Sequence, residues 1–261
     1  MAKPGARTPR RSPWDRPLRL MSRLGRHDAA LLVGLALVAG AAWVFLAIAD
    51  EVTDGDTHAI DERILLAMRT PGDPTDPLGA HWVEEVGRDL TALGSNVILA
   101  LVTVAVCVHL ILLRRLRTAG FVAAAVVSGT LLSFALKNAF DRPRPDLVPH
   151  GTYVYTASFP SGHAMLSALT YLTLAAVLAR AQPRRRLKAC VLLTAILVTV
   201  LVGVSRVYLG VHWPTDVLAG WTVGAGWAAL CWLLAAWLQR RGAVEPETSP
   251  DLHEDDSQIT S

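Results

Sequence analysis

The sequence predicts an all-α membrane protein, a six-span transmembrane helical bundle with short amphipathic helices in the first outer loop. Of the 261 residues, 52% are hydrophobic and only 18% are charged, whereas a soluble domain averages roughly 25% charged residues. The mean hydropathy of +0.37 agrees with this prediction. The apolar residues also lie in long uninterrupted blocks, and about 18 or more consecutive apolar residues indicate a membrane span.

Six apolar blocks define the expected spans. They are Ala29–Ala49, Ala92–Leu113, Thr118–Leu136, Ala164–Ala179, Ala189–Ser205 and Val217–Leu238. The fourth and fifth blocks are too short to cross a hydrocarbon core of about 30 Å at about 1.5 Å per residue. Their helices are therefore expected to extend through polar residues at one end. In the sixth span, Gly220 and Gly224 favour close helix packing within one bundle over dimerisation.

The segment between the first two spans is acidic and contains the turn residues Pro71, Pro74 and Pro77. Apolar residues recur at helical spacing in Ile60–Arg69, which predicts a short helix lying at the outer surface. A second short helix is expected around Leu78–Leu90. Both helices are expected to cover or pack against the bundle.

Two polar segments flank the expected membrane domain, residues 29–240. Residues 1–28 hold eight Lys or Arg and four Pro, and they are expected to form a disordered basic arm in the cytoplasm. Residues 241–261 are acidic and nearly free of large apolar side chains. That composition predicts a disordered cytoplasmic tail, because such a segment cannot bury enough apolar surface to fold.

The distribution of basic residues predicts the orientation in the membrane. With the N-terminus inside, the cytoplasmic segments hold 18 of the 25 Lys and Arg. The positive-inside rule then places both termini in the cytoplasm of a multi-pass cell-membrane protein. The net charge of +3 therefore reflects anchoring, and a nucleic-acid partner is not expected.

Several basic residues on the outer side lie at the ends of spans, where ionisable residues are candidates for function. Lys137 ends the third span, and Arg144 follows it in an extended segment that contains two prolines. The alternative is structural, because a Lys near a helix C-terminus offsets the helix dipole and the segment from Arg142 to Pro145 would then be a plain loop.

A second cluster, Pro160-Ser161-Gly162-His163, stands immediately before the fourth span. Ser161 suits an N-cap, Gly162 allows close backbone approach, and the free N–H groups of a helix start bind anions. His163 would project from the first turn. The alternative is a simple Ser cap followed by an incidental His.

A third cluster links the last two spans, from Ser205-Arg206 to His212 and Asp216. Pro214 suits the first position of a helix, so Asp216 falls in its first turn and can reach back to His212. A carboxylate partner orients a His and stabilises its positive form. The alternative is that Asp216 only complements the helix N-terminus.

The topology places all three clusters on the same outer face. Together they supply two His, an Asp, a Lys, two Arg and an exposed helix start, which suits phosphoryl transfer. The cations and N–H groups offset charge on the phosphate oxygens, while one His attacks phosphorus and the other protonates the leaving oxygen. Because no carboxylate cluster has metal-ligand spacing, no metal or other cofactor is expected, and the cations take the part that Mg²⁺ plays elsewhere.

The three isolated cysteines, Cys107, Cys190 and Cys231, each lie in an apolar block and predict neither a disulfide nor a metal site.

These motifs resemble those of the type 2 phosphatidic acid phosphatase superfamily, the integral-membrane lipid phosphatases. The matching elements are Lys137-x6-Arg144-Pro145, Pro160-Ser161-Gly162-His163 and Ser205-Arg206-x5-His212-x3-Asp216, in that order and with both internal spacings kept. The resemblance covers roughly residues 90–238.

The resemblance implies a role for each matched residue. His212 is implied to be the nucleophile that forms a phosphohistidine, Asp216 the residue that orients it, and His163 the general acid. The implied phosphate-binding residues are Lys137, Arg144, Ser161, Gly162 and Arg206. Arg142, Asp141 and Asp146 lie outside the motif positions and receive no catalytic role.

The expected function is that of an outer-face lipid phosphatase whose substrate is a lipid phosphate within the bilayer, with undecaprenyl diphosphate as the first choice and undecaprenyl phosphate as its product. Phosphatidylglycerol phosphate, phosphatidic acid and diacylglycerol diphosphate stay open as substrates. A phosphotransferase with a lipid A or sugar acceptor would use the same residues. A transporter with a degenerate anion site is not expected, because His163, His212 and Asp216 are all intact. The resemblance also extends to the vanadate-dependent haloperoxidases, but those enzymes are soluble, and the six spans argue against that interpretation.

Overall fold

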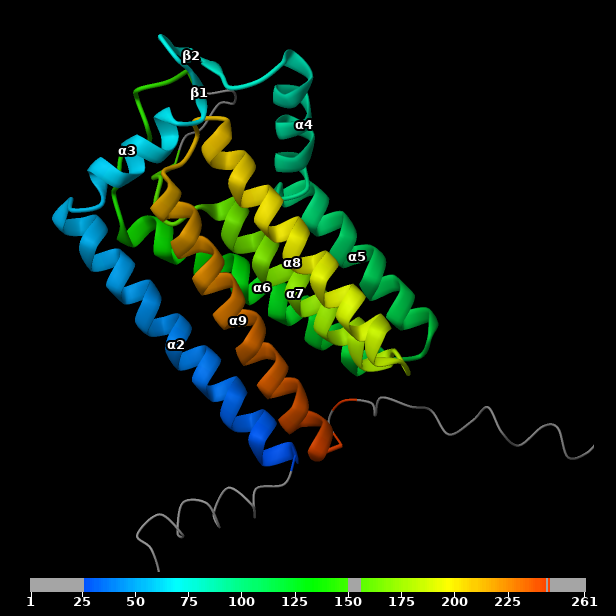
Figure 1. The fold of residues 1–261 in the computed structure, drawn as a ribbon. Helices are drawn as coiled ribbons and strands as arrows, with labels where there is room; N and C mark the ends of the chain where they lie inside the picture. Colours follow the sequence, from blue (N-terminus) through cyan, green and yellow to red (C-terminus); the bar gives the residue numbers. More distant parts are fainter. Residues whose placement is uncertain (1–25, 150–155, 243, 245–261) are drawn as a thin grey trace, which may run out of the picture.

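The computed structural model of the chain describes residues 26–149, 156–242 and 244. Long helices run side by side across the molecule (Figure 1). They are α2 (Arg26–Asp54), α5 (Asn96–Leu112), α6 (Leu116–Ala139), α7 (Gly162–Ala181), α8 (Arg185–Tyr208) and α9 (Pro214–Arg240). The predicted all-α membrane bundle is confirmed.

Five of these helices, all but α5, are long and apolar enough to cross a membrane, counted over the described residues. The exception is α5, which has 17 residues and follows the short helix α4 (His81–Ala92) after a bend of 50°. Taken as one broken span, α4 and α5 provide the sixth crossing. The predicted second span was therefore placed correctly, although its first residues belong to the bend and not to α5.

The two spans with the shortest apolar blocks, α7 and α8, are longer than those blocks. As expected from their short apolar lengths, α7 extends at its start to include His163, and α8 extends at its end through Arg206. Helix α2 begins at Arg26, so the last residues of the predicted basic arm are helical. The rest of that arm, and nearly all of the predicted acidic tail, lie outside the described residues.

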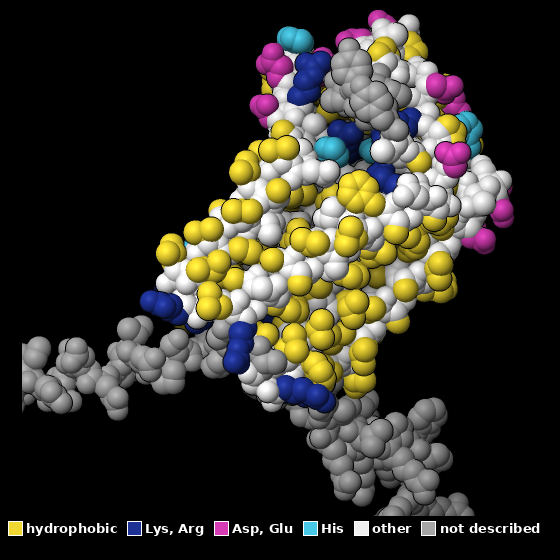
Figure 2. Space-filling model, turned by 180° about the vertical axis from the view of Figure 1, so that it is seen from behind, with side chains coloured by type: hydrophobic (Ala, Val, Ile, Leu, Met, Phe, Trp, Pro, Cys, Tyr) yellow, Lys and Arg dark blue, Asp and Glu magenta, His cyan; other side chains and the backbone are white. Residues whose placement is uncertain are grey.

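Apolar side chains cover the outside of the bundle. Leu35 and Trp43 of α2 and Leu193 of α8 are each more than half exposed. Figure 2 shows such side chains around the middle of the molecule, with Lys and Arg visible at both ends and Asp and Glu visible at only one of them. Apolar side chains of this kind suit contact with lipid. The helices also satisfy their own backbone hydrogen bonds, which is required where no water is present.

The segment between α2 and α5, predicted to be the first outer loop and called the outer loop below, folds into compact structure at one end of the bundle (Figure 1). Helix α3 (His58–Leu66) and α4 confirm the two short helices that were predicted. Between them lies an antiparallel hairpin, β1 (Arg69–Thr70) and β2 (Asp73–Pro77), which was not predicted. Pro71-Gly72 forms its turn, with Gly72 at φ 91°, as a Pro-Gly turn with a left-handed second residue requires.

The start of α9 packs closely against the start of α7. A Cβ atom on Gly220 would lie 2.7 Å from the carbonyl oxygen of Ser161, and one on Gly224 would lie 2.4 Å from that of Met165. Only glycine permits this approach, which agrees with the close packing predicted from their spacing. The contact brings Asp216 of α9 beside the residues that begin α7.

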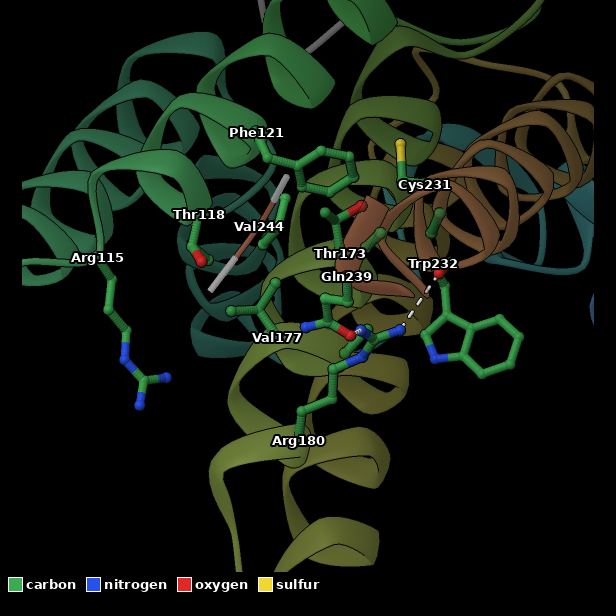
Figure 3. Close-up of a pocket in the computed structure, with 13 residues that line it drawn as sticks. Arg115, Thr118, Phe121, Thr173, Val177, Arg180, Cys231, Trp232, Gln239 and Val244 are labelled. Carbon is green, nitrogen blue, oxygen red and sulfur yellow. Dashed lines mark hydrogen bonds between the residues drawn. The ribbon is translucent and has the colours of Figure 1, made fainter. Parts of the chain in front are cut away.

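At the opposite end of the bundle, Arg180 ties α7 to α9 (Figure 3). Its guanidinium donates to Oε1 of Gln239 at 2.7 Å and to the carbonyl oxygen of Trp232 at 3.2 Å. The cavity beside it has a volume of about 40 Å³, which accommodates water but not a lipid headgroup. The larger polar cavity lies at the end that carries the outer loop.

Candidate active site

The three predicted clusters meet in one cavity of about 310 Å³ beneath the outer loop. Six of the eight predicted site residues line it: Lys137, Arg144, Gly162, His163, Arg206 and His212. Lys137 is in the last turn of α6 and Arg206 in the last turn of α8. The other two, Ser161 and Asp216, are fully buried and outside the lining of the cavity. Helix ends from three spans thus supply one polar site.

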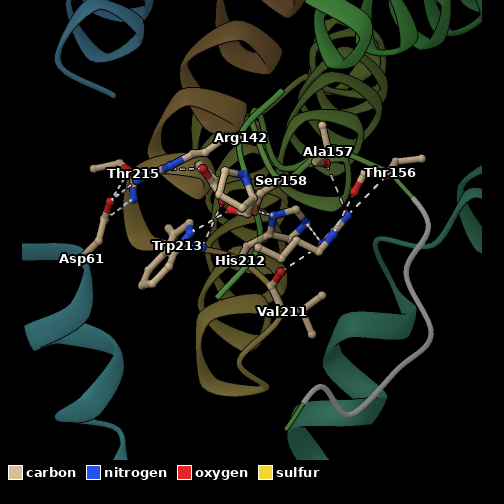
Figure 4. Close-up of polar contacts among 12 residues, drawn as sticks. Asp61, Arg142, Thr156, Ala157, Ser158, Val211, His212, Trp213 and Thr215 are labelled. Carbon is tan, nitrogen blue, oxygen red and sulfur yellow. Dashed lines mark hydrogen bonds and ion pairs between the residues drawn. The ribbon is translucent and has the colours of Figure 1, made fainter. Parts of the chain in front are cut away.

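Asp216 reaches back from the first turn of α9 to His212. Pro214 begins the helix, and Oδ2 of Asp216 accepts the backbone N–H of Trp213 at 3.0 Å. The same oxygen lies 3.4 Å from Nδ1 of His212. The hydroxyl of Ser158 donates to this oxygen and lies 3.3 Å from Nδ1, so the carboxylate and the ring are joined both directly and through Ser158, which lies beside His212 in Figure 4.

The other ring nitrogen of His212 is oriented toward a cation. Its Nε2 lies 3.2 Å from Nη1 of Arg144, and because a guanidinium only donates, Nε2 must accept. We therefore assign the proton to Nδ1, on the side of Asp216. His212 is 2% exposed, and burial lowers its pKa to about 3, although Asp216 partly opposes this shift. The result is a neutral imidazole with its lone pair on Nε2, as a nucleophile requires.

Three cations surround the cavity, and each is fixed by a neutral oxygen. Lys137 donates to the carbonyl oxygen of Ala157 at 2.9 Å, and Arg144 donates to that of Val211 at 2.9 Å. Arg206 donates to Oγ1 of Thr91 at 3.0 Å. Burial lowers the pKa of the Arg144 guanidinium, since little water is present to solvate its charge.

The Arg206 guanidinium has spare hydrogen-bonding capacity. Its Nε is buried and has no hydrogen-bond partner among the described residues, although buried N–H groups are almost always paired. Three like charges around one cavity repel one another, and an anion with several acceptor oxygens would relieve this repulsion. A phosphate group is such an anion.

The start of α7 differs in detail from the prediction. Ser161 is the N-cap residue, but its hydroxyl makes no capping hydrogen bond. Instead its backbone N–H donates to the carbonyl oxygen of Asp216 at 2.9 Å, and its buried hydroxyl has no partner among the described residues. A Cβ atom at Gly162 would lie 3.1 Å from Cε of Lys137, so the glycine leaves room for the Lys137 side chain.

Four residues that contact the site were missed by sequence reasoning. Thr91 pairs with Arg206, Ser158 pairs with Asp216, and Arg142 bridges Asp216 to Asp61 of α3. The available signal for Arg142 was its position on the outer side with no topological explanation. Asp61, Thr91 and Ser158 had no distinguishing signal, because each reaches the site through contacts distant in sequence.

The polar groups around this cavity suit an anion better than a metal ion. Over the residues that the structure describes, no three or more His, Cys, Asp or Glu side chains are arranged to hold a metal.

The chain is similar in sequence to known proteins. The sequence profile of the PAP2 superfamily matches residues 117–240. Phosphatidylglycerophosphatase B of Bacillus subtilis is 34% identical over 183 residues, which is 69% of this chain and 85% of that protein. An undecaprenyl-diphosphatase of Sulfolobus acidocaldarius is 43% identical over 68 residues, 26% of this chain and 29% of that protein.

The fold is also similar to a solved structure. The crystal structure of the transmembrane PAP2 type phosphatidylglycerolphosphate phosphatase from Bacillus subtilis matches with a TM-score of 0.70 at 28% identity. The match covers 78% of this chain and 97% of that one.

Proposed function

Since the chain belongs to the PAP2 superfamily of membrane lipid phosphatases, hydrolases of phosphate esters, we propose that it removes the terminal phosphate of a lipid through a phosphohistidine at His212. The observation that carries the proposal is the buried, neutral His212 between Asp216 and a cavity lined by Lys137, Arg144 and Arg206. The reaction then proceeds in two steps.

In the first step, Lys137, Arg144 and Arg206 bind the phosphate oxygens. Arg144 transfers its hydrogen bond from Nε2 of His212 to a phosphate oxygen, which frees the Nε2 lone pair. Nε2 attacks phosphorus while the bond from phosphorus to the lipid oxygen breaks, and His163 donates a proton to that oxygen. The His212 ring becomes cationic, and the Asp216 carboxylate beside Nδ1 stabilises it.

In the second step, water attacks the phosphohistidine. His163, now neutral, accepts the proton of this water, and the bond from phosphorus to Nε2 breaks. Inorganic phosphate leaves, and His212 returns to its neutral form with the proton on Nδ1. The cations stabilise the charge on the phosphoryl oxygens in both transition states.

An apolar groove between α5 and α6 is proposed to hold the lipid chains. Its volume is about 560 Å³, and Asn96 and Leu166 line both this groove and the phosphate cavity. Val104 of α5 and Val127 of α6 line it and are each 60% exposed, so the groove opens sideways toward the bilayer. A lipid can thus place its phosphate among the cations while its chains stay in an apolar environment.

Ala123→Phe is expected to narrow this groove and raise KM for a long-chain lipid phosphate about 10-fold, a loss of roughly 1.4 kcal/mol. The KM for a short-chain, water-soluble phosphate ester should not change, because it needs only the polar cavity. The matched control is Ala124→Phe, since Ala124 is exposed on the same helix and does not line the groove. An equal rise in KM in both variants, or for both substrates, would contradict the assignment of the groove.

The site is proposed to face the outside of the cell. The connections α5–α6 and α7–α8 lie at the end opposite the cavity (Figure 1), and basic residues stand in them and in the helix starts that follow, within Arg114–Arg117 and Arg184–Lys188. The positive-inside rule places that basic end, where α2 begins and α9 ends, in the cytoplasm. Both chain termini are accordingly proposed to be cytoplasmic.

Phosphatidylglycerol phosphate is the proposed first substrate, because the chain matches 85% of a phosphatidylglycerophosphatase at 34% identity. Undecaprenyl diphosphate, which the sequence analysis expected, is the second candidate and is favoured by the shorter match to an undecaprenyl-diphosphatase. Both present a terminal phosphate on a lipid.

Rates measured side by side on purified, detergent-solubilised protein test this choice. We expect kcat/KM for phosphatidylglycerol phosphate to exceed those for undecaprenyl diphosphate and phosphatidic acid by about 10-fold or more. A higher value for undecaprenyl diphosphate would favour the second candidate. Product analysis separates hydrolysis, which releases inorganic phosphate, from transfer to a lipid A or sugar acceptor.

The same assay includes a chelator, since the cations are proposed to supply the charge neutralisation. Activity should be retained in EDTA, and a strict requirement for added Mg²⁺ would contradict this part of the mechanism.

A further inference from the structure

Asp61 of α3 is fully buried although it belongs to the outer loop. Its Oδ1 accepts the backbone N–H of Thr215 at 2.9 Å. Its Oδ2 accepts the hydroxyl of Thr215 at 2.6 Å and Nη2 of Arg142 at 2.7 Å. A carboxylate is rarely buried without such partners, and these partners lie beside the proposed nucleophile (Figure 4).

Arg142 joins Asp61 to Asp216. Its Nη1 donates to Oδ1 of Asp216 at 2.6 Å, while its Nη2 contacts Asp61. The other oxygen of Asp216, Oδ2, is the one that contacts His212. Arg142 therefore holds the free side of the carboxylate and fixes the plane in which Oδ2 meets the His212 ring.

The charges of this cluster explain why a second carboxylate is present. Arg142 alone would cancel the charge of Asp216, and the cationic His212 of the phosphoenzyme would then lack a counter-ion. With Asp61 included, two carboxylates and one guanidinium leave one net negative charge next to Nδ1. In a buried site such a charge interacts strongly, because little water screens it.

We propose that Asp61 and Arg142 are positioning residues for catalysis, in which Arg142 orients Asp216 and Asp61 balances Arg142 so that Asp216 keeps its charge toward His212. The outer-loop helix α3 is then a part of the catalytic machinery and more than a cover for it. This inference rests on the proposed function of His212.

The charge is tested with Asp61→Asn, which keeps the size of the side chain and an oxygen that can accept from Thr215. We expect kcat to fall about 10- to 100-fold, because the cationic intermediate loses its counter-ion. The KM and the inhibition constant of orthovanadate, a phosphate analogue, should stay within about twofold, since no cavity-lining cation contacts Asp61. Asp56→Asn is the matched control, because Asp56 precedes the same helix and is exposed.

A double variant separates charge balance from simple attachment of α3. Arg142→Gln keeps an N–H that can donate to Asp216 but removes the positive charge. The Asp61→Asn/Arg142→Gln double variant therefore restores one net negative charge, and its kcat should exceed that of Asp61→Asn by about fivefold or more. If the two residues only fasten α3 to the bundle, the double variant will be no faster than Asp61→Asn.

All rates are taken per folded protein, judged by gel filtration and the thermal unfolding midpoint. If Asp61→Asn does not fold, a double variant with kcat within about 10-fold of wild type supports charge balance, and a greater loss overturns it. If Asp61→Asn turns over at the wild-type rate while His212→Ala is inactive, the inference fails and the proposed function stands. Turnover by His212→Ala would instead overturn the function itself.

Discussion

His212→Ala is expected to abolish phosphate release from lipid phosphates, lowering kcat/KM by about 10,000-fold or more. The proposed nucleophile is the only group for which the structure combines burial, a carboxylate at Nδ1 and a cation at Nε2, considered over the described residues. Alanine removes the atom that forms the bond to phosphorus. The remaining cations still bind the phosphate group of the substrate. Inorganic phosphate should therefore compete with substrate for binding to the variant as strongly as it does for binding to wild type.

Two measurements accompany this variant. Brief incubation with lipid carrying a labelled terminal phosphate, followed by a base quench, should trap an acid-labile phosphoenzyme in wild type and none in His212→Ala. His81→Ala is the control, because the His81 side chain on α4 is 78% exposed. Wild-type turnover by His212→Ala, or labelling of that variant, would contradict a phosphohistidine at this position.

His163→Ala is expected to have the second-largest effect, and the loss should depend on the leaving group. For a lipid ester, kcat should fall about 100- to 10,000-fold, the usual range for loss of a general acid. An alkoxide is a poor leaving group without a proton. An aryl phosphate leaves as a stable phenolate, so its first step should proceed in His163→Ala almost as fast as in wild type.

Rapid-mixing kinetics make this prediction specific to the role. With an aryl phosphate, His163→Ala should release a stoichiometric burst of phenolate and then stall as the phosphohistidine, because the second step lacks its general base. His212→Ala should show no burst. Equal losses for alkyl and aryl esters in His163→Ala, without a burst, would show that His163 contributes to phosphate binding and not to proton transfer.

Local sequence patterns were sufficient for much of the site. Lys137 and Arg206 each fall in the last turn of a helix, and Asp216 falls in the first turn of α9. Span topology then places these ends on one face. The Asp216 contact to His212 was accessible because the two residues are four positions apart, and a side chain in the first turn of a helix can reach back to the residue just before the N-cap.

Contacts between distant segments were not accessible in this way. The hairpin β1–β2 arises in a segment rich in Asp and Pro that carries no alternating apolar pattern. The site of Asp61 depends on the packing of α3 over the start of α9, and its ion pair with Arg142 joins residues 81 positions apart. No local periodicity encodes such a pairing.

The sequence by itself determined the membrane bundle and the helix that each motif ends or begins. Length and periodicity of apolar residues are local quantities, which is why they were sufficient. Only the tertiary structure decided which groups hold those residues in place: Thr91 on Arg206, Ser158 on Asp216, and the Asp61–Arg142 pair behind them. These contacts follow from close packing between elements, such as the glycine contact of α9 with α7, which depends on the whole chain.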